Sequence, residues 1–233
     1  MADVFSAVFV IVRGRLSDAG QRWLEAAIAS ARGGDINRLA GSYTAASRQA
    51  GMAPLGADAA ERASLAALAP GLSCAHWTVA DAARAALLLA SAQDSSNEPR
   101  FVHAALTCFE NGDAREQQSW LRAVSLLPHH ERFTAAAVDA CRSHIQPTFE
   151  AIACENPYPS IRFSERQFNQ MVLKAMFTGV RLERIVGLAR RLNPELSQMS
   201  RDYATERRAA GRSVPADLAL ALHDAEALEE HLS

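Results

Sequence analysis

Start and stop signals for amphipathic helices recur along the whole chain, whereas runs that alternate with the period of a strand are rare. Ser17 precedes a helical run that stops at Gly33, and Asp35 opens the next one. Thr78 and Asp81 have the spacing of a capping box, in which two side chains satisfy backbone N–H groups at the start of a helix. Alanine, the strongest helix former, is very abundant. The pattern therefore predicts an all-α fold.

The helix starts also repeat at a regular distance. Those at Thr78, Asp113 and Pro147 are 35 and 34 residues apart, and each marks a helix, a tight turn and a second helix. Helical hairpins repeated at such intervals are typical of α-solenoids. Because no TPR consensus is present, the spacing favours a HEAT-like α-solenoid of stacked helical hairpins. The alternative is an irregular α-bundle.

The best-specified helix start lies in the last third of the chain. Ser164 and Gln167 form a capping box that predicts a helix over 165–178. The preceding letters NPYP, residues 156–159, predict extended backbone, because a residue before proline avoids the α region. Two further helices are expected, over 182–192 and 194–210.

We expect a single domain built from three consecutive parts. These are an Ala-rich helical-repeat region, a set of helices packed on the same core, and an acidic C-terminal helix, at residues 1–155, 156–215 and 216–233. The N-terminal run VFSAVFVIVRGRL imitates a signal sequence, but Asp3 stands where a basic segment is expected, and the run is too short to span a bilayer. A buried first helix is expected, with peripheral membrane contact as the alternative.

Composition and motifs argue against several classes of function. A net charge of −2 argues against a nucleic-acid-binding protein, whose surface must neutralise phosphates. The four cysteines form no CxxC or CxxH pair, and adjacent His129 and His130 would point apart on a helix, so no metal site is expected. No nucleotide-binding or hydrolase motif occurs, and no cofactor is expected. Cysteines in apolar helical contexts predict a reduced, cytoplasmic protein.

The region from Asn156 to Arg212 differs from the rest of the chain in charge. It holds eleven basic and five acidic residues, a local charge of +6 in a chain of net charge −2. Such a surface suits an anionic small molecule or an acidic partner, because guanidinium groups bind phosphate and carboxylate through paired hydrogen bonds. Lys174, the only lysine, shares one predicted helical face with Arg166 and Gln170.

Lys174 has two interpretations. It is either an amine that faces a ligand or an ion-pair partner of Asp202 or Glu206. These two carboxylates lie four residues apart on one predicted helix, a spacing that suits acid–base chemistry but also salt bridges with the many arginines. Tyr203 and Arg207 fall within the apolar stripe of the same helix and predict a half-buried polar network.

The motifs NPYP, FNQMVLKA, NPEL, DYATER and AAGRSVP occur in this order between residues 156 and 215. On these motifs the chain resembles the signature region of EboA-domain proteins, and the upstream segment GDAREQQSWLR is similar in style. The resemblance implies membership of a bacterial gene cluster for metabolite traffic or secondary metabolism, which also encodes a UbiA-type prenyltransferase and a TatD-like hydrolase. It supplies no catalytic residues. The candidate binding positions are Asn156, Tyr158, Arg166, Asn169, Gln170, Lys174, Arg184, Asp202, Tyr203, Glu206, Arg207 and Arg212.

These observations lead to alternative hypotheses about function. The first is a non-catalytic helical-repeat protein that binds an anionic or prenylated intermediate, or docks pathway enzymes such as the prenyltransferase. The second is an enzyme of unrecognised type, in which Lys174, Asp202, Glu206 and Tyr203 act in a basic pocket. A third is a purely structural role for the motif. The sequence leaves the oligomeric state open.

Overall fold

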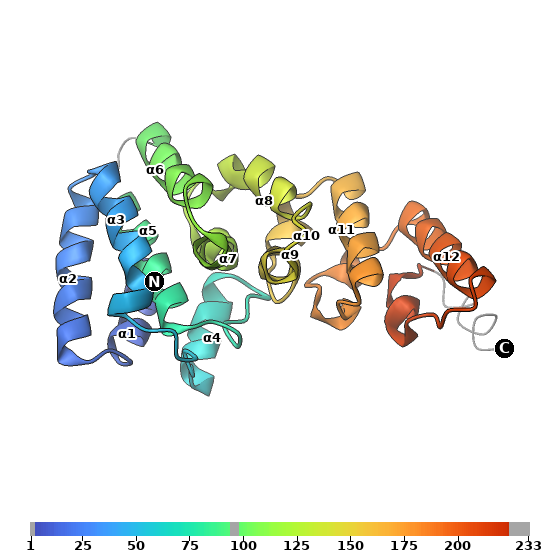
Figure 1. Ribbon diagram of the computed structural model, residues 1–233, viewed down its shortest axis with the longest axis horizontal. Helices are drawn as coiled ribbons and strands as arrows, with labels where there is room; N and C mark the ends of the chain where they lie inside the picture. The colour runs from blue at the N-terminus through green and yellow to red at the C-terminus, as the bar shows by residue number, and fades with distance from the viewer. Residues whose placement is uncertain (1–2, 94–97, 224–233) are drawn as a thin grey trace. The chain divides into compact units, whose positions relative to one another are not determined.

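The computed structural model describes residues 3–93 and 98–223, and the regular elements in these ranges are all helical (Figure 1). The prediction of an all-α fold is confirmed. Backbone contacts divide the chain into two compact units, which we call the N-terminal unit (residues 1–152) and the C-terminal unit (residues 153–233). The HEAT-like solenoid, and a core shared by both units, stay predictions.

One buried helix forms the centre of the N-terminal unit. Residues 79–90 of α5 are all buried, and α1, α2, α3 and α7 pack against this helix. A helix that is mostly apolar on every side is stable only inside a core. The elements are α1 (Val4–Arg13), α2 (Asp18–Arg32), α3 (Ile36–Gln49), α4 (Ala59–Leu68), α5 (Val79–Gln93), α6 (Glu98–Glu110), α7 (Ala114–Ala123), η1 (Val124–Leu126), η2 (His130–Phe133), α8 (Thr134–Ala140) and α9 (Gln146–Ala153).

The capping residues predicted from the sequence begin these helices. The side chains of Ser17, Asp35 and Asp113 accept hydrogen bonds from backbone N–H groups in the first turns of α2, α3 and α7. At α5, the Asp81 N–H donates to the Thr78 hydroxyl, and the Thr78 N–H donates to the Asp81 carboxylate. These predictions are confirmed, because each cap satisfies N–H groups that have no partner inside the helix.

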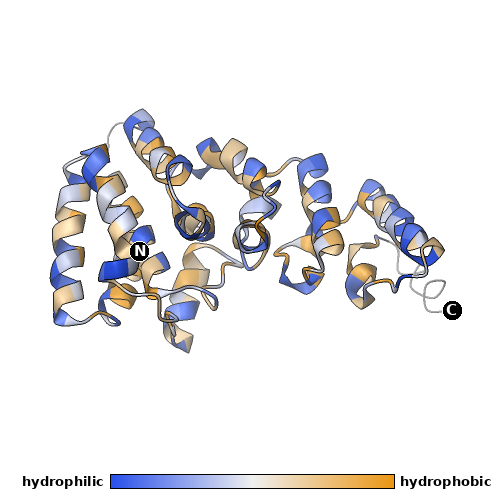
Figure 2. Ribbon diagram, in the orientation of Figure 1, coloured by the Kyte–Doolittle hydropathy of each residue, from blue (hydrophilic) through white to orange (hydrophobic). Residues whose placement is uncertain are grey.

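The C-terminal unit combines three α-helices with three short 3-10 helices in its described residues. They are α10 (Tyr158–Arg162), α11 (Glu165–Thr178), η3 (Leu182–Arg184), η4 (Leu188–Arg191), α12 (Pro194–Ala209) and η5 (Ala216–Ala221). Ser164 and Gln167 form the predicted capping box at α11. Figure 2 shows α12 as a largely hydrophilic helix with a narrow apolar side, as expected for a helix that covers a small core.

Two local predictions in the C-terminal unit are wrong. The α-helix expected over 182–192 is replaced by η3 and η4, because Gly187 between them adopts a left-handed conformation (φ 79°) that interrupts a helix. A Cβ at Gly187 would lie 2.7 Å from the Cβ of Ser160, so this position requires glycine. NPYP is not extended either: Tyr158 begins α10, and a first helical turn tolerates Pro159 because an N–H there would have no helical partner.

The apolar helix at the start of the chain contributes to the core. Its buried residues are Phe5, Val8, Ile11 and Val12, which confirms the prediction of a buried first helix. None of the described helices has both the length and the apolar character needed to cross a membrane. Peripheral membrane contact stays a prediction.

The C-terminal segment differs from its prediction where it is described. Residues 216–221 form the 3-10 helix η5, whereas an α-helix was expected. The acidic residues from 224 onward, which belong to the same predicted helix, lie outside the described residues.

A buried guanidinium connects three helices of the N-terminal unit. Arg84 on α5 donates hydrogen bonds to the Tyr43 carbonyl (3.0 Å) and the Ser47 hydroxyl (2.8 Å), both on α3. It also donates to the Ser119 hydroxyl of α7 (3.0 Å) and lies 3.7 Å from the Glu116 carboxylate. Arg84 and Glu116 are almost fully buried. Each charge therefore depends on the other, because a lone buried charge is very unfavourable.

The network continues to the first turn of α5. The Ser119 hydroxyl donates to one oxygen of Asp81 (2.5 Å), and Arg122 donates to the other (2.9 Å). The second oxygen also accepts hydrogen bonds from the backbone N–H and the hydroxyl of Thr78. The carboxylate that helps to start α5 therefore also anchors α7.

Replacing Arg84 with Met keeps most of the side-chain volume and removes the charge. We expect Arg84→Met to lower the free energy of unfolding by about 3–5 kcal/mol, because Glu116 then becomes an uncompensated buried charge. Urea unfolding followed by circular dichroism measures the change.

The double variant Arg84→Met/Glu116→Gln removes both charges and should recover part of the loss. Arg48→Met, at an exposed position on α3, is the matched control and should change stability by less than about 0.5 kcal/mol. A double variant as unstable as Arg84→Met alone would contradict the assignment of the loss to unpaired Glu116.

Cys108 on α6 is buried, and burial raises the pKa of its thiol to about 12. A thiol is nucleophilic only as the thiolate, so native Cys108 should resist alkylation by iodoacetamide at mildly alkaline pH. The same residue should react once the protein is unfolded in concentrated urea. Peptide mass spectrometry measures the labelled fraction, and extensive labelling of Cys108 in the folded protein would refute this prediction.

Candidate functional site

The C-terminal unit contains a surface pocket of about 450 Å³ beside the end of α11, which we call the α11 pocket. Its walls are mostly apolar and come from Met176, Val180, Pro215, Ala216, Ala219 and Leu220. Three polar side chains, those of Arg181, Glu183 and Asp217, also line it. Pockets of this size, with an apolar lining and a few polar groups, are typical binding sites for small molecules. The α11 pocket is therefore the candidate functional site.

The α11 pocket forms where α11 stops and the chain turns back. Gly179 ends α11 in a left-handed conformation (φ 73°), which glycine adopts without steric cost. Just after this turn, the Leu182 N–H donates a hydrogen bond to the Asp217 carboxylate at 2.7 Å. This charge-assisted bond joins the start of η3 to η5, so it holds two walls of the pocket together.

The charged groups of the lining differ in what they do. Asp217 is engaged by the Leu182 N–H and serves the pocket's own structure. Arg181 and Glu183, by contrast, form an ion pair whose side chains are both exposed. An exposed pair contributes little to stability, so an anion can compete for the guanidinium of Arg181 at low cost.

Two predicted residues of α12 support the pocket from behind its lining. The Tyr203 hydroxyl is buried and donates to the backbone carbonyl of Met176 (3.0 Å). Arg207 lies over the ring of Tyr203 (5.7 Å from its centroid) and donates through Nε to the Ser213 carbonyl (2.6 Å). Met176 belongs to one wall, and Ser213 precedes Pro215 in another. The half-buried polar network predicted for Tyr203 and Arg207 is confirmed, and it fixes the backbone of both walls.

A reciprocal amide pair joins α11 to α12. Asn169 donates to the side-chain oxygen of Asn193 (3.1 Å) and accepts from its side-chain nitrogen (3.0 Å). The same Asn193 oxygen caps α12 by accepting the Leu196 N–H (2.8 Å). Both asparagines are buried, so their polar groups must be satisfied within the protein. Asn169 is therefore placed as a structural residue.

The predicted residues near the start of this unit are also held by local contacts. The Asn156 side-chain oxygen accepts the backbone N–H of Tyr158 (3.0 Å), and both residues are buried. Arg184 donates two hydrogen bonds to the carboxylate of Glu155 (2.8 and 3.0 Å). Glu155 itself has a left-handed backbone (φ 51°), and its N–H donates to the Arg184 carbonyl (2.9 Å). This pair joins the segment before α10 to η3.

Arg191 is a structural residue that the sequence prediction missed. Its guanidinium donates to the backbone carbonyls of Ser160 (2.7 Å) and Phe163 (2.9 Å) and lies over the ring of Phe168 (4.7 Å from its centroid). It therefore joins η4 to the junction between α10 and α11. No local signal in the sequence reveals this role, because its partners lie 23 to 31 residues earlier in the chain.

The remaining candidates are nearer the surface. Lys174 is half-buried, and the exposed ones are Arg166, Gln170, Asp202, Glu206 and Arg212. Asp202 accepts a hydrogen bond from Gln198 one turn earlier on α12 (2.8 Å). None of the twelve candidate positions is a lining residue of the α11 pocket. Prediction missed the lining because most of it consists of apolar residues, which carry no chemical signature.

A family model described as metabolite traffic protein EboA matches residues 5–223. The chain belongs to the EboA family. No curated protein and no solved structure matches it. The EboA match covers both units, so it extends well beyond the motifs between residues 156 and 215. The family's description concerns metabolite traffic and gives no residue a role.

A substitution of Arg207 tests whether α12 holds the wall of the α11 pocket that follows Ser213. Arg207→Ala removes the hydrogen bond to the Ser213 carbonyl, so we expect faster amide hydrogen exchange over residues 212–222 and a loss of about 1–3 kcal/mol in stability. Hydrogen–deuterium exchange with mass spectrometry measures the first effect, and urea unfolding measures the second. Arg166→Ala, at an exposed position on α11, is the control and should change neither. If amide exchange over residues 212–222 is equally fast in Arg207→Ala and Arg166→Ala, Arg207 does not hold this wall of the pocket.

Proposed function

We propose that this EboA-family protein is a non-catalytic metabolite-binding protein, and that its α11 pocket holds an anionic, prenylated intermediate. The observation that carries this proposal is the lining of the pocket: a mostly apolar cavity of about 450 Å³ with an exposed arginine among its residues. An apolar chain gains from leaving water for such walls, while a phosphate or carboxylate head gains paired hydrogen bonds from a guanidinium. The local charge of +6 between residues 156 and 212 favours the same anionic class.

The support given by Tyr203 and Arg207 strengthens the proposal. A binding site must hold its walls in place before the ligand arrives, because ordering them on binding lowers affinity. Tyr203 fixes the backbone at Met176, and Arg207 fixes it at Ser213, so these EboA motif residues preorganise the pocket. In this proposal Tyr203 and Arg207 do not touch the ligand; they hold the backbone of the residues around it.

The enzyme alternative, with Lys174, Asp202, Glu206 and Tyr203 as acid–base groups, receives less support. The Tyr203 hydroxyl is buried and donates to a backbone carbonyl, which occupies its proton. Asp202 and Glu206 are exposed, whereas acid–base catalysis relies on groups held against a substrate. We therefore place metabolite binding first.

Docking to pathway enzymes is a second part of the proposal. Phe177, beside the pocket residue Met176, is 60% exposed, and Leu220 of the lining is 44% exposed. Exposed apolar groups at a pocket suit transfer of an apolar chain to an acceptor, and the EboA resemblance offers the UbiA-type prenyltransferase and the TatD-like hydrolase as acceptors. All four cysteines are buried thiols, which suits a reducing compartment, so we propose a cytoplasmic location.

Geranyl phosphate is a suitable probe because it combines a prenyl chain with a phosphate. We expect isothermal titration calorimetry to detect its binding to the wild type, and Ala216→Trp, which fills the pocket, to weaken binding by about tenfold or more. Arg181→Gln should weaken binding of geranyl phosphate while leaving any binding of uncharged geraniol unchanged.

Two matched controls make this test specific. Ala209→Trp adds the same ring at an exposed position of α12, and Arg166→Gln removes the same charge from an exposed position of α11. Both should bind geranyl phosphate as the wild type does. If the wild type binds none of the probes, or if Ala216→Trp binds as tightly as Ala209→Trp, the α11 pocket is not the metabolite site.

A further inference from the structure

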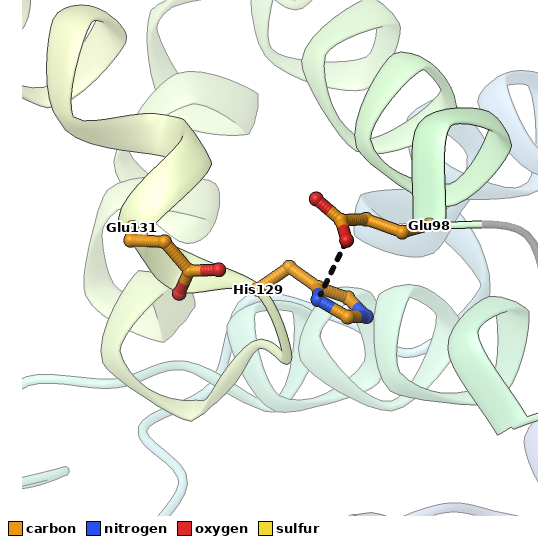
Figure 3. Close-up of side chains that lie close together, drawn as sticks. All are labelled: Glu98, His129 and Glu131. Carbon is orange, nitrogen blue, oxygen red and sulfur yellow. Dashed lines mark ion pairs between the residues drawn. The ribbon is translucent and has the colours of Figure 1, made fainter.

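Three side chains that can ligate a metal meet in the N-terminal unit, outside the motifs between residues 156 and 215 that carry the family resemblance. Glu98 is the first residue of α6, and His129 and Glu131 lie at the start of η2. One donor atom from each side chain lies within 4.8 Å of the other two. Figure 3 shows the Glu98 carboxylate beside the ring of His129, with the carboxylate of Glu131 on the left of the view.

Two of the donor atoms are as far apart as two ligands of one ion. Nδ1 of His129 lies 3.5 Å from Oε2 of Glu98, which is longer than a good hydrogen bond. Two ligands that are each about 2.0–2.2 Å from one tetrahedral ion are roughly 3.3–3.6 Å apart. Glu131 offers a carboxylate oxygen within 4.8 Å of both of these atoms and would supply the third ligand.

The imidazole is held in this position by its surroundings. His129 has a left-handed backbone (φ 51°, ψ 31°), a conformation in which histidine is several-fold enriched among residues other than glycine. Its ring lies 6.4 Å from that of Phe101, which is buried and packs edge-on against Phe133. The ring therefore has a buried aromatic neighbour, and because its side chain is 39% exposed, an ion can reach it from solvent.

A second contact orients the Glu98 carboxylate. Arg132 Nε lies 3.5 Å from Oε1 of Glu98, while Oε2 faces His129. Groups that hold the outer oxygen of a ligating carboxylate, or the second nitrogen of a ligating imidazole, tune and position metal sites. Arg132 would act in this way, since it engages the oxygen that does not face the imidazole.

We propose that Glu98, His129 and Glu131 bind one divalent transition-metal ion, with zinc as the best match. An imidazole with two carboxylates suits zinc, whereas magnesium and calcium prefer ligand sets made of oxygen alone. Three protein ligands leave a fourth position for water or for a ligand group. The site lies in the N-terminal unit, so the proposal goes beyond the metabolite pocket and does not depend on it.

Metal titration of the full-length protein, after removal of bound metal with EDTA, tests the site. We expect one equivalent of zinc to bind, magnesium to bind far more weakly, and cobalt to give the visible absorption of a low-symmetry site with nitrogen and oxygen ligands. Each of Glu98→Gln, His129→Gln and Glu131→Gln should weaken zinc binding by about tenfold or more. Circular dichroism establishes that each variant is folded, and three separate variants keep the test informative if one of them is not.

The adjacent histidine supplies a matched control. His130→Gln removes the same type of side chain one residue away and should leave zinc affinity and the cobalt spectrum unchanged. The proposal is overturned if the wild type binds no zinc, or if folded His129→Gln binds zinc as tightly as His130→Gln. Binding of geranyl phosphate in the same variants gives an independent readout, because the α11 pocket should function whether or not the metal site exists.

Discussion

The buried guanidinium of Arg84 is the contact on which the N-terminal unit depends. The surface of α5 is rich in alanine, whose small side chains offer little shape to fix how neighbouring helices slide or rotate. Directional hydrogen bonds from Arg84 to α3 and α7 remove that freedom, because only one relative placement satisfies all of them. The ion pair with Glu116 makes the placement obligatory rather than merely favourable, since a misplaced helix would leave a charge unpaired in the core.

The sequence revealed what acts over a few residues. Caps such as Ser17, Asp113 and Ser164 satisfy N–H groups within three positions, so their spacing alone identifies them. Contacts between distant segments have no such signal: Asn169 and Asn193 are 24 residues apart, and Arg84 and Ser119 are 35 apart. The same limit applies to Gly187: the sequence pattern predicts a continuous helix there, because the close approach to Ser160 becomes visible only in three dimensions.

In the candidate site, too, the sequence indicated some of the residues that matter and not others. The candidates from the sequence are mostly polar residues, and many of them hold the backbone of the C-terminal unit. The Tyr203 hydroxyl donates to a carbonyl of α11, and Arg207 donates to a carbonyl in the loop before η5. The pocket surface itself is made by ordinary residues such as Val180 and Ala219, which no motif search singles out. A family motif can therefore identify the residues that hold a site's backbone more readily than the residues that line the site.

Tyr203 and Arg207 donate hydrogen bonds to the main-chain carbonyls of Met176 and Ser213. These hydrogen bonds do not involve the side chains of Met176 and Ser213. Residues 216 and 219 line the pocket, and neither of them supplies a carbonyl that Tyr203 or Arg207 holds. The residues that hold the backbone, Tyr203 and Arg207, are therefore different from the residues that line the pocket. Under the proposed function, substitutions in the lining would change which metabolite binds while the two carbonyl contacts stay in place.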